Sequence, residues 1–310
     1  MFTKAILPFL LLSLLNVASR ATASGLARGD LIYFGKEDEP VGFSACWRVL
    51  DPEKTNMGTP GAFLLCETLI ANEEGKGISF RQESDPLANT YKGSYAKAWC
   101  EEFYSAHFSE TEKSYIIPTY KDDPAFAIRA GFAQGDRGPM VNFDPESKAL
   151  DGDHLFLLSA EEGSNPDYGL GEEESRVAGL FGTAQSYWLR SPHDKSFAND
   201  VGMVFYNGWL MDFIQNSDNV FMTGPTCMRP ALNLDLSLAN LQSVGEGKWR
   251  LGDSYSGETY VTPPTPKENI MPNVMLSLGI VSFALILGGL IVAPIILVRH
   301  HKRKAKKKNL

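Results

Sequence analysis

The sequence predicts a mixed α+β body of one domain, followed by a single transmembrane helix. Three observations lead to this prediction. Helix and strand patterns are mixed without the regular alternation of a βαβ fold, the last third of the body is rich in strand patterns, and residues 270–298 contain no charged side chain. The predicted segments are a signal peptide at 1–23, an extracellular domain at 24–242, a stalk at 243–270, a transmembrane helix at 271–298 and a basic cytoplasmic tail at 299–310.

The charge of the chain is distributed unevenly along its 310 residues. The formal net charge is −8 and 44% of the residues are hydrophobic, which excludes a disordered or collagen-like chain and argues against nucleic-acid binding. Residues 1–23 and 271–310 hold nine of the 29 Lys and Arg and no Asp or Glu. Residues 24–270 therefore hold 20 basic and all 37 acidic residues, a net charge of −17.

The N-terminus has the layout of a secretory signal peptide. Lys4 precedes an apolar run at 5–15, and Ala21-Thr22-Ala23 follows as a cleavage site of small residues. We expect cleavage after Ala23. An uncleaved membrane anchor is the alternative, because Lys4 is the only basic residue before the apolar run.

The second apolar run, at 271–298, is long enough to cross a membrane, since about 20 apolar residues suffice. The basic run from Arg299 to Lys308 places the C-terminus in the cytoplasm by the positive-inside rule and attracts anionic lipid headgroups. Prolines before the helix favour a stiff, extended stalk. The sequence thus predicts a single-pass plasma-membrane protein with its N-terminus outside, on a bacterial cell surface; the absence of N-x-S/T sequons fits this source.

All four cysteines lie in the predicted extracellular part, where an even number favours disulfide bonds. The segments around Cys46 and Cys66 are expected to be antiparallel strands, and if Leu50 faces Ala62, then Cys46 faces Cys66. Metal binding is the alternative, but the sequence has no C-x-x-C spacing. The expected pairs are Cys46–Cys66 and Cys100–Cys227.

The first part of the body combines strands with two helices. A strand is expected at 31–35, and apolar residues at three- and four-residue spacing predict a helix at 94–107, with Ser94 as its N-cap. The segment 109–112 is a capping box that opens a second, short helix. A strand at 154–158 is followed by a cap at Ser159 and a turn of helix.

The last part of the body is predicted to be mostly strands, after a helix at 172–180. Asn207-Gly208 is a strong hairpin signal, and a two-residue turn there sets Tyr206 opposite Trp209. Residues 228–238 alternate in polarity, so they are predicted to form a half-buried strand with its leucines inward and Asn233 on the other face.

Several segments, in order, resemble the blocks of an uncharacterised bacterial extracellular family that is described only as a domain of unknown function. They are the W-R-V-L block at 47–50, the helix at 97–104 with the segment 108–113, L-L-S-A-E-E at 157–162, W-L-R-S-P at 188–192 and R-P-A-L at 229–232. The likeness covers about residues 31–236. It departs at Tyr187, where the family has Trp, at His193, where Gly is usual, and in the four cysteines.

This family is similar to the C-type-lectin-like fold, which also includes formylglycine-generating enzymes. The resemblance implies a single C-type-lectin-like mixed domain with short helices and a β-rich C-terminal third, but a fold implies no chemistry by itself. The copper-type oxidases of that superfamily rely on a close pair of cysteines near the C-terminal end, where this chain has Cys227 alone. Iron-dependent relatives need a His-rich arrangement, which His107, His154 and His193 do not provide. The resemblance therefore argues against an enzyme.

Arg190, Arg229, Trp47 and Trp188 lie in these motifs among apolar residues. The structural interpretation is that each guanidinium bonds loop carbonyls or carboxylates, and the functional interpretation is a clamp for a ligand carboxylate or phosphate. Trp188 and Trp209 are expected to lie in the core, and the alternative is that they form a platform on which a sugar stacks. The loops at 191–201 and 215–227 are predicted to form a binding face. The candidate ligand-binding residues are Arg190, His193, Asn199, Asp200, Asn216, Asp218 and Asn219.

No catalytic residue is predicted, because the sequence has no G-x-S-x-G, H-E-x-x-H or P-loop motif. No cofactor is expected. Asp151 and Asp153 could supply oxygen ligands to calcium, but Asp151-Gly152-Asp153 completes no known calcium loop and is an ordinary turn sequence.

The sequence favours a membrane-anchored extracellular module that binds an unknown protein or glycan. The alternative is a cell-surface hydrolase that uses two carboxylates, for example on carbohydrate, since such pairs have no signature in sequence spacing. The other expected partners are the lipid bilayer, through residues 271–298, and anionic headgroups at the basic tail. No nucleic acid is expected.

Overall fold

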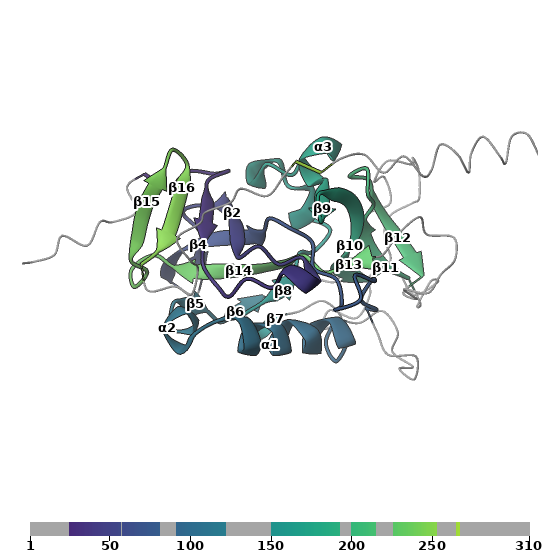
Figure 1. Cartoon of the computed structure of the whole chain (residues 1–310), viewed down its shortest axis with the longest axis horizontal. Coiled ribbons are helices and arrows are strands. Elements are labelled where there is room, and N and C mark those ends of the chain that lie inside the picture. Colours follow the sequence, from purple (N-terminus) through teal and green to yellow (C-terminus); the bar gives the residue numbers. More distant parts are fainter. Residues whose placement is uncertain are drawn as a thin grey trace, which may run out of the picture.

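Figure 1 presents the computed structural model, which describes residues 25–56, 58–80, 91–121, 150–192, 200–214, 226–252 and 265–266. The described part is a strand-rich α+β fold with few helices, as predicted. Its helices are α1 (Tyr95–His107), α2 (Glu110–Lys113) and α3 (Glu173–Arg176), with single 3-10 turns η1 (Glu39–Val41), η3 (Glu162–Ser164) and η4 (Pro166–Tyr168).

The strands form one large sheet, a second sheet and a small two-stranded ribbon. The first eight strands are β1 (Leu31–Tyr33), β2 (Cys46–Asp51), β3 (Thr55–Asn56), β4 (Thr59–Cys66), β5 (Ile116–Ile117), β6 (Thr119–Lys121), β7 (Leu150–Asp153) and β8 (Phe156–Leu157). The last eight are β9 (Ala178–Leu180), β10 (Thr183–Pro192), β11 (Asp200–Val204), β12 (Leu210–Ile214), β13 (Thr226–Cys227), β14 (Pro230–Asp235), β15 (Leu241–Gly245) and β16 (Lys248–Leu251).

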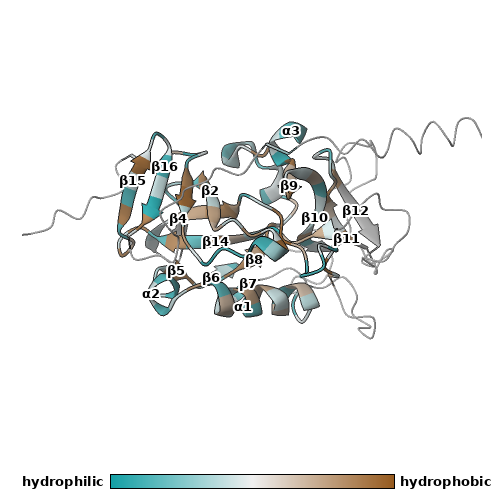
Figure 2. Ribbon diagram, viewed as in Figure 1, coloured by the Kyte–Doolittle hydropathy of each residue, from teal (hydrophilic) through white to brown (hydrophobic). Residues whose placement is uncertain are grey.

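The large sheet has nine strands, with the main order β15-β16-β1-β2-β4-β14-β5; β3 pairs with β4, and β8 with β14. Hydrophobic residues run through its central strands, whereas hydrophilic residues gather on outer elements such as α2 (Figure 2). The strand β14 was predicted to be half-buried. In the structure Ala231 and Asn233 are buried as fully as Leu232 and Leu234, because other elements pack on both faces of the sheet.

Neither predicted disulfide forms, although all four cysteines lie in the described residues and all are buried. The register of β2 and β4 sets Trp47, not Cys46, opposite Cys66. A shift of one residue turns a side chain to the other face of a sheet. Cys46 therefore packs with Leu31 and Tyr33, while Cys66 belongs to the main core.

The predicted Cys100–Cys227 bridge fails because the two residues have different neighbours. Cys100 faces inward from α1, where its thiol interacts with the Tyr91 hydroxyl. Cys227 lies in β13, beside the strand β10 of the second sheet. Burial raises the pKa of both thiols to about 12, so both stay protonated at neutral pH.

The helix α1 covers one side of the large sheet, below β6, β7 and β8 in Figure 1. Its N-cap is Ser94, as predicted, and the Ser94 hydroxyl accepts from the amide of Lys97. The predicted capping box opens α2: the Ser109 hydroxyl accepts from the Glu112 amide, and the Glu112 carboxylate accepts from the Ser109 amide. The same carboxylate also accepts from Gly35 N at 2.8 Å, which ties α2 to β1.

The second sheet has the order β12-β11-β10-β13, with β9 paired to β10. The helix predicted at 172–180 is wrong over its second half. It ends at Arg176, and β9 turns back onto β10 through Phe181-Gly182, two residues with positive φ (49° and 76°). Pairing with β10 therefore overrides the local helix pattern.

The hairpin signal at Asn207-Gly208 is correct, but its predicted register is wrong. The strands β11 and β12 pair so that Val204 faces Leu210, and Phe205 N donates to Trp209 O at 2.7 Å. The turn therefore has three residues, with Gly208 last at φ 88°. This is a type I turn followed by a left-handed glycine, the usual three-residue hairpin.

The C-terminal strands extend the body beyond its predicted end at residue 242. The hairpin β15–β16 joins the large sheet, and β16 pairs in parallel with β1. Residues 243–252, which were predicted to belong to the stalk, are therefore part of the body. Pro266, within the segment predicted to be the stalk, lies against β9, where its Cγ comes within 3.0 Å of the position that a Cβ on Gly179 would take.

No helix of the described residues is long and apolar enough to cross a membrane. The segments 1–23 and 271–298 lie outside the described residues.

Candidate functional site

Of the seven candidate ligand-binding residues, only Arg190 and Asp200 lie in the described part of the chain. Arg190 is buried in β10 and points inward. Asp200 begins β11. The other candidates lie outside the described residues: His193, Asn199, Asn216, Asp218 and Asn219.

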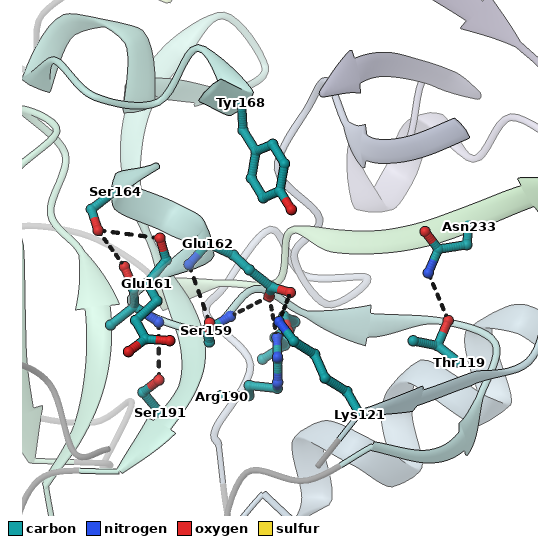
Figure 3. A network of polar contacts seen from close by, with 12 residues as sticks. Thr119, Lys121, Ser159, Glu161, Glu162, Ser164, Tyr168, Arg190, Ser191 and Asn233 are labelled. Atoms are coloured by element: carbon teal, nitrogen blue, oxygen red, sulfur yellow. Dashed lines mark hydrogen bonds and ion pairs between the residues drawn. The ribbon is translucent and has the colours of Figure 1, made fainter. Parts of the chain in front are cut away.

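Arg190 joins two of the family motifs through an ion pair in the core (Figure 3). Its guanidinium pairs with the Glu162 carboxylate and donates to Leu157 O at 2.8 Å. Lys121 Nζ, at the end of β6, reaches the other carboxylate oxygen of Glu162 at 2.6 Å. Glu162 is also held locally, because its carboxylate accepts from Ser159 N and its amide donates to the Ser159 hydroxyl. The L-L-S-A-E-E segment is thus a capping box docked onto β10.

The charges around Glu162 keep its carboxylate ionised. Burial alone would raise the pKa of Glu162, but the positive charges of Arg190 and Lys121 outweigh burial and hold this pKa well below its ordinary value. A carboxyl group in this state accepts hydrogen bonds but does not serve as a general acid near neutral pH.

Arg229 forms a second buried cluster, with neutral acceptors. Its Nε donates to Cys66 O at 2.9 Å and its Nη1 to the Tyr187 hydroxyl at 3.1 Å. The guanidinium lies over the Tyr187 ring, 5.1 Å from its centroid. Tyr187 in turn donates to Arg176 O at 3.0 Å. Tyr187 therefore supplies a hydroxyl that accepts a hydrogen bond from Arg229.

Trp209 is 38% exposed, so its predicted place in the core is wrong, whereas both motif tryptophans are fully buried. Trp47 Nε1 donates to Phe34 O at 3.1 Å, and Trp188 Nε1 donates to Ile78 O at 2.7 Å. With their N–H groups bonded inside the protein, these rings act as core residues and offer no face to a ligand in this conformation.

A third group of polar residues lies beside the Glu162 network and keeps unused hydrogen-bonding capacity. Lys54 Nζ donates to the Tyr168 hydroxyl at 2.8 Å and lies over the rings of Tyr168 and Phe63, 5.4 and 5.8 Å from their centroids. Phe63 pairs across the strands with Asn233, which puts Asn233 on the same face of the sheet. Lys54, Tyr168 and Asn233 are called the polar cluster below.

Asn233 carries a buried acceptor whose bonding potential is unmet. Its side chain is 4% exposed, and Nδ2 donates to the Thr119 hydroxyl at 2.8 Å. The Thr119 hydroxyl itself donates to Ile117 O, so it receives the amide rather than donating to it. Asn233 Oδ1 is then left without a hydrogen-bond partner within the described chain. In Figure 3 the Tyr168 hydroxyl points toward the Glu162 carboxylate, and the Asn233 oxygen points away from Thr119, on the side of Tyr168.

Rigid local structure positions the other two members of the polar cluster. Tyr168 ends η4, whose N-cap Asn165 accepts from Asp167 N at 2.8 Å. Arg28 Nη1 donates to the Asp167 carbonyl at 2.7 Å and holds the same turn in place. Lys54 is fixed by its own carbonyl, which accepts from Gly61 N at 2.8 Å. A Cβ at Gly61 would lie 2.7 Å from Leu234 O, so glycine is required for this close approach.

The charge on Lys54 is retained despite partial burial. Burial alone would lower the pKa of Lys54, but its hydrogen bond to Tyr168 and the negative charge of Glu162 raise this pKa above its ordinary value. The polar cluster is not predicted by the sequence motifs. The available signal was Asn233 itself, an amide in the middle of a strand that is otherwise apolar up to Asp235.

The two calcium candidates do not converge. Asp153 is buried, and its carboxylate pairs with Lys97 and accepts from Asp151 N at 2.8 Å. Asp151 is exposed. No group of three or more His, Cys, Asp or Glu side chains that could hold a metal ion occurs in the described residues.

A family model described as a domain of unknown function (DUF6273) matches residues 61–236 of the chain. The matched range contains Glu162, Tyr168, Arg190, Arg229 and Asn233, whereas Trp47 and Lys54 precede it. No curated protein and no solved structure matches the chain.

Proposed function

The chain belongs to the DUF6273 family of domains of unknown function, and from this premise we propose that it is a membrane-anchored extracellular binding module. In this proposal the leader at 1–23 is removed, the body binds a protein or glycan outside the cell, and the helix at 271–298 holds it in the plasma membrane. A C-type-lectin-like arrangement of the body is part of the same proposal.

One observation carries the choice of binding over catalysis: the carboxylates that are buried in the described part of the chain all form ion pairs or hydrogen bonds within the protein. Glu162 pairs with Arg190 and Lys121, Glu112 closes the capping box of α2, and Asp153 pairs with Lys97. A carboxylate-based hydrolase needs one carboxyl group with a raised pKa as a general acid. The pKa of Glu162 is shifted in the opposite direction.

The membrane part of the proposal is supported by charge and by the place of the stalk. The body is strongly acidic and the tail strongly basic, as the positive-inside rule requires for a tail in the cytoplasm. Pro266 lies against β9, and the five residues 267–271 span at most about 18 Å. The body would therefore stand close to the bilayer, rather than at the end of a long spacer.

Epitope tags test the topology. One tag is inserted after Ser24 and another is added after Leu310 of the full chain. On intact cells antibody should reach only the first tag, and permeabilisation should expose the second. Antibody binding to the C-terminal tag on intact cells would contradict the proposed orientation.

Arrays test the binding function. The full chain in lipid nanodiscs is applied to glycan and peptide arrays, and the same oligosaccharides are incubated with it and analysed for cleavage. We expect retention on a defined subset of ligands without cleavage. Cleavage by the wild-type chain that persists after independent purifications would contradict a pure binding function.

A further inference from the structure

We propose that the polar cluster of Lys54, Tyr168 and Asn233 is a binding site for a carboxylated saccharide. This inference rests on the proposed binding function and names the ligand class and its site. Neither the sequence motifs nor the family match assigns any role to these three residues.

Asn233 Oδ1 is a buried hydrogen-bond acceptor without a partner in the described chain. A buried polar atom without a partner costs roughly 1–3 kcal/mol, so native proteins rarely keep one. The Thr119 hydroxyl cannot relieve Asn233 Oδ1, because its proton is directed to Ile117 O. A ligand O–H or N–H would satisfy this oxygen.

Tyr168 and Lys54 form a pair of hydrogen-bond donors that a ligand can use. The Tyr168 hydroxyl accepts from Lys54, which leaves its own proton available. The Lys54 ammonium group donates one of its three N–H groups to Tyr168. Both side chains are half-buried, so an arriving acceptor can replace their mutual contact and reach both donors.

The charges around the polar cluster favour an anionic ligand. Lys54, Lys121 and Arg190 bring three positive charges to this region, and Glu162 and Asp51 bring two negative charges. The site is thus positive inside a body of net charge −17. A carboxylate is the group that two donors and a positive surrounding favour.

The same positive charge restricts the donor that binds Asn233. An ammonium group next to Lys54 and Lys121 would be repelled, so the donor must be neutral. A hydroxyl near a carboxylate meets both demands, and uronic acids carry this combination. Neutral sugars lack the carboxylate, and phosphate lacks a neutral donor placed apart from its charge.

The test measures binding of D-glucuronate to the full chain in lipid nanodiscs by saturation-transfer-difference NMR, with D-glucose and inorganic phosphate as comparison probes. The site variants are Lys54→Met, which keeps the length of the side chain without its charge, and Tyr168→Phe, which removes the hydroxyl alone. Both positions are half-buried at the surface of the fold, so the variants are expected to fold.

The chain offers a matched control pair at another place. Lys113 lies over the ring of Tyr104, 5.8 Å from its centroid, and the Tyr104 hydroxyl donates to Lys113 O. Lys113→Met and Tyr104→Phe therefore remove the same groups from a similar lysine–tyrosine contact away from Asn233.

The expected result is saturable binding of glucuronate but not of glucose, weakened about tenfold or more by Lys54→Met and about threefold to tenfold by Tyr168→Phe, with both control variants like wild type. Glucuronate binding unaffected by the two site variants would overturn the site. Phosphate binding as tight as glucuronate, with the same dependence on Lys54, would overturn the ligand class. Absence of glucuronate binding in a chain that still binds array ligands would overturn this inference alone, whereas absence of all binding would overturn the proposed function as well.

Discussion

At the scale of single residues, the motif arginines are structural, and each uses a different kind of acceptor. Arg190 pairs with the Glu162 carboxylate, while the acceptors of Arg229 within the described residues are the Cys66 carbonyl, the Arg176 carbonyl and the Tyr187 hydroxyl. The planar fork of five donors lets one side chain bind several elements at once. Each arginine therefore brings distant segments of the chain together in the core.

Glu162→Gln should strongly destabilise the fold. The substitution leaves Arg190 buried with a neutral partner, and breaking a buried ion pair in this way typically costs about 3–5 kcal/mol. The free energy of unfolding of the full chain, from urea denaturation, measures the loss. Glu161→Gln is the matched control, because Glu161 is the exposed neighbour and should change stability by less than about 0.5 kcal/mol. Equal losses for the two variants would contradict the ion pair.

Glu162 should also make the protein sensitive to acid. The pKa of its carboxyl group is lowered in the folded state, so the unfolded chain binds the proton more tightly. Its contribution to stability is complete above the ordinary pKa of about 4.5 and is lost as the pH falls through the lower, folded value. The unfolding free energies of wild type and Glu162→Gln, measured from pH 7 to pH 3, should therefore converge in acid. A constant difference would contradict the lowered pKa.

At the scale of elements, turns decide how the second sheet meets α3. The Asn207-Gly208 turn lies directly on this helix: Arg176 Nε donates to Gly208 O at 2.6 Å, and Trp209 Nε1 donates to the Glu173 carboxylate at 2.6 Å. A Cβ at Gly208 would lie 1.9 Å from Glu173 O. The glycine is therefore required twice, by its φ of 88° and by the close approach of the helix.

Gly208→Ala should cost much more stability than Gly58→Ala. Gly58 has a similar φ of 85° but nothing within 4 Å of the Cβ position, so alanine there should cost about 1–2 kcal/mol from backbone strain alone. At Gly208 the hairpin must also move away from α3, which adds roughly 1–3 kcal/mol. Thermal unfolding measures both losses, and Trp209 fluorescence should change only in Gly208→Ala. Equal losses would show that the contact with Glu173 is unimportant.

At the scale of the whole molecule, the large sheet takes strands from both ends of the body. The strand β1 pairs on one side with β2 and on the other with β16, more than 200 residues later in the chain. Trp249 connects β16 with the segment just before β1. Its Nε1 donates to the Asp30 carboxylate at 2.8 Å, and its ring lies 3.5 Å from the position that a Cβ on Gly25 would take. The outer edge of β1 is thus paired with β16.

Truncation should reveal this dependence. A chain of residues 24–242 ends at the boundary that the sequence suggested, and it loses β16 and Trp249. It should unfold at lower temperature and self-associate through the exposed edge of β1 more than a chain of residues 24–252. Thermal unfolding and size-exclusion chromatography of the two chains make the comparison. Equal stability would mean that β15–β16 adds nothing to the body.

Features that rest on local contacts were predictable from the sequence. The Ser94 N-cap, the capping box at Ser109 and the presence of a turn at Asn207-Gly208 each depend on residues within a few positions of one another. The helix predicted through 180 failed because β9 gains its bonds from β10, which a local pattern does not report. The motif arginines were located, but their partners were not, since Glu162 and Cys66 are distant in the chain.

The sequence by itself determined the class of the body, its caps and turns, and the segregation of basic charge at its ends. Only the tertiary structure decided the register of the strands, and with it the face on which each side chain lies. A one-residue shift separated Cys46 from Cys66, and packing on both faces of β14 buried Asn233. The physical reason is that hydrophobic periodicity sets the type of an element, whereas register and burial depend on neighbours that are far away in the chain.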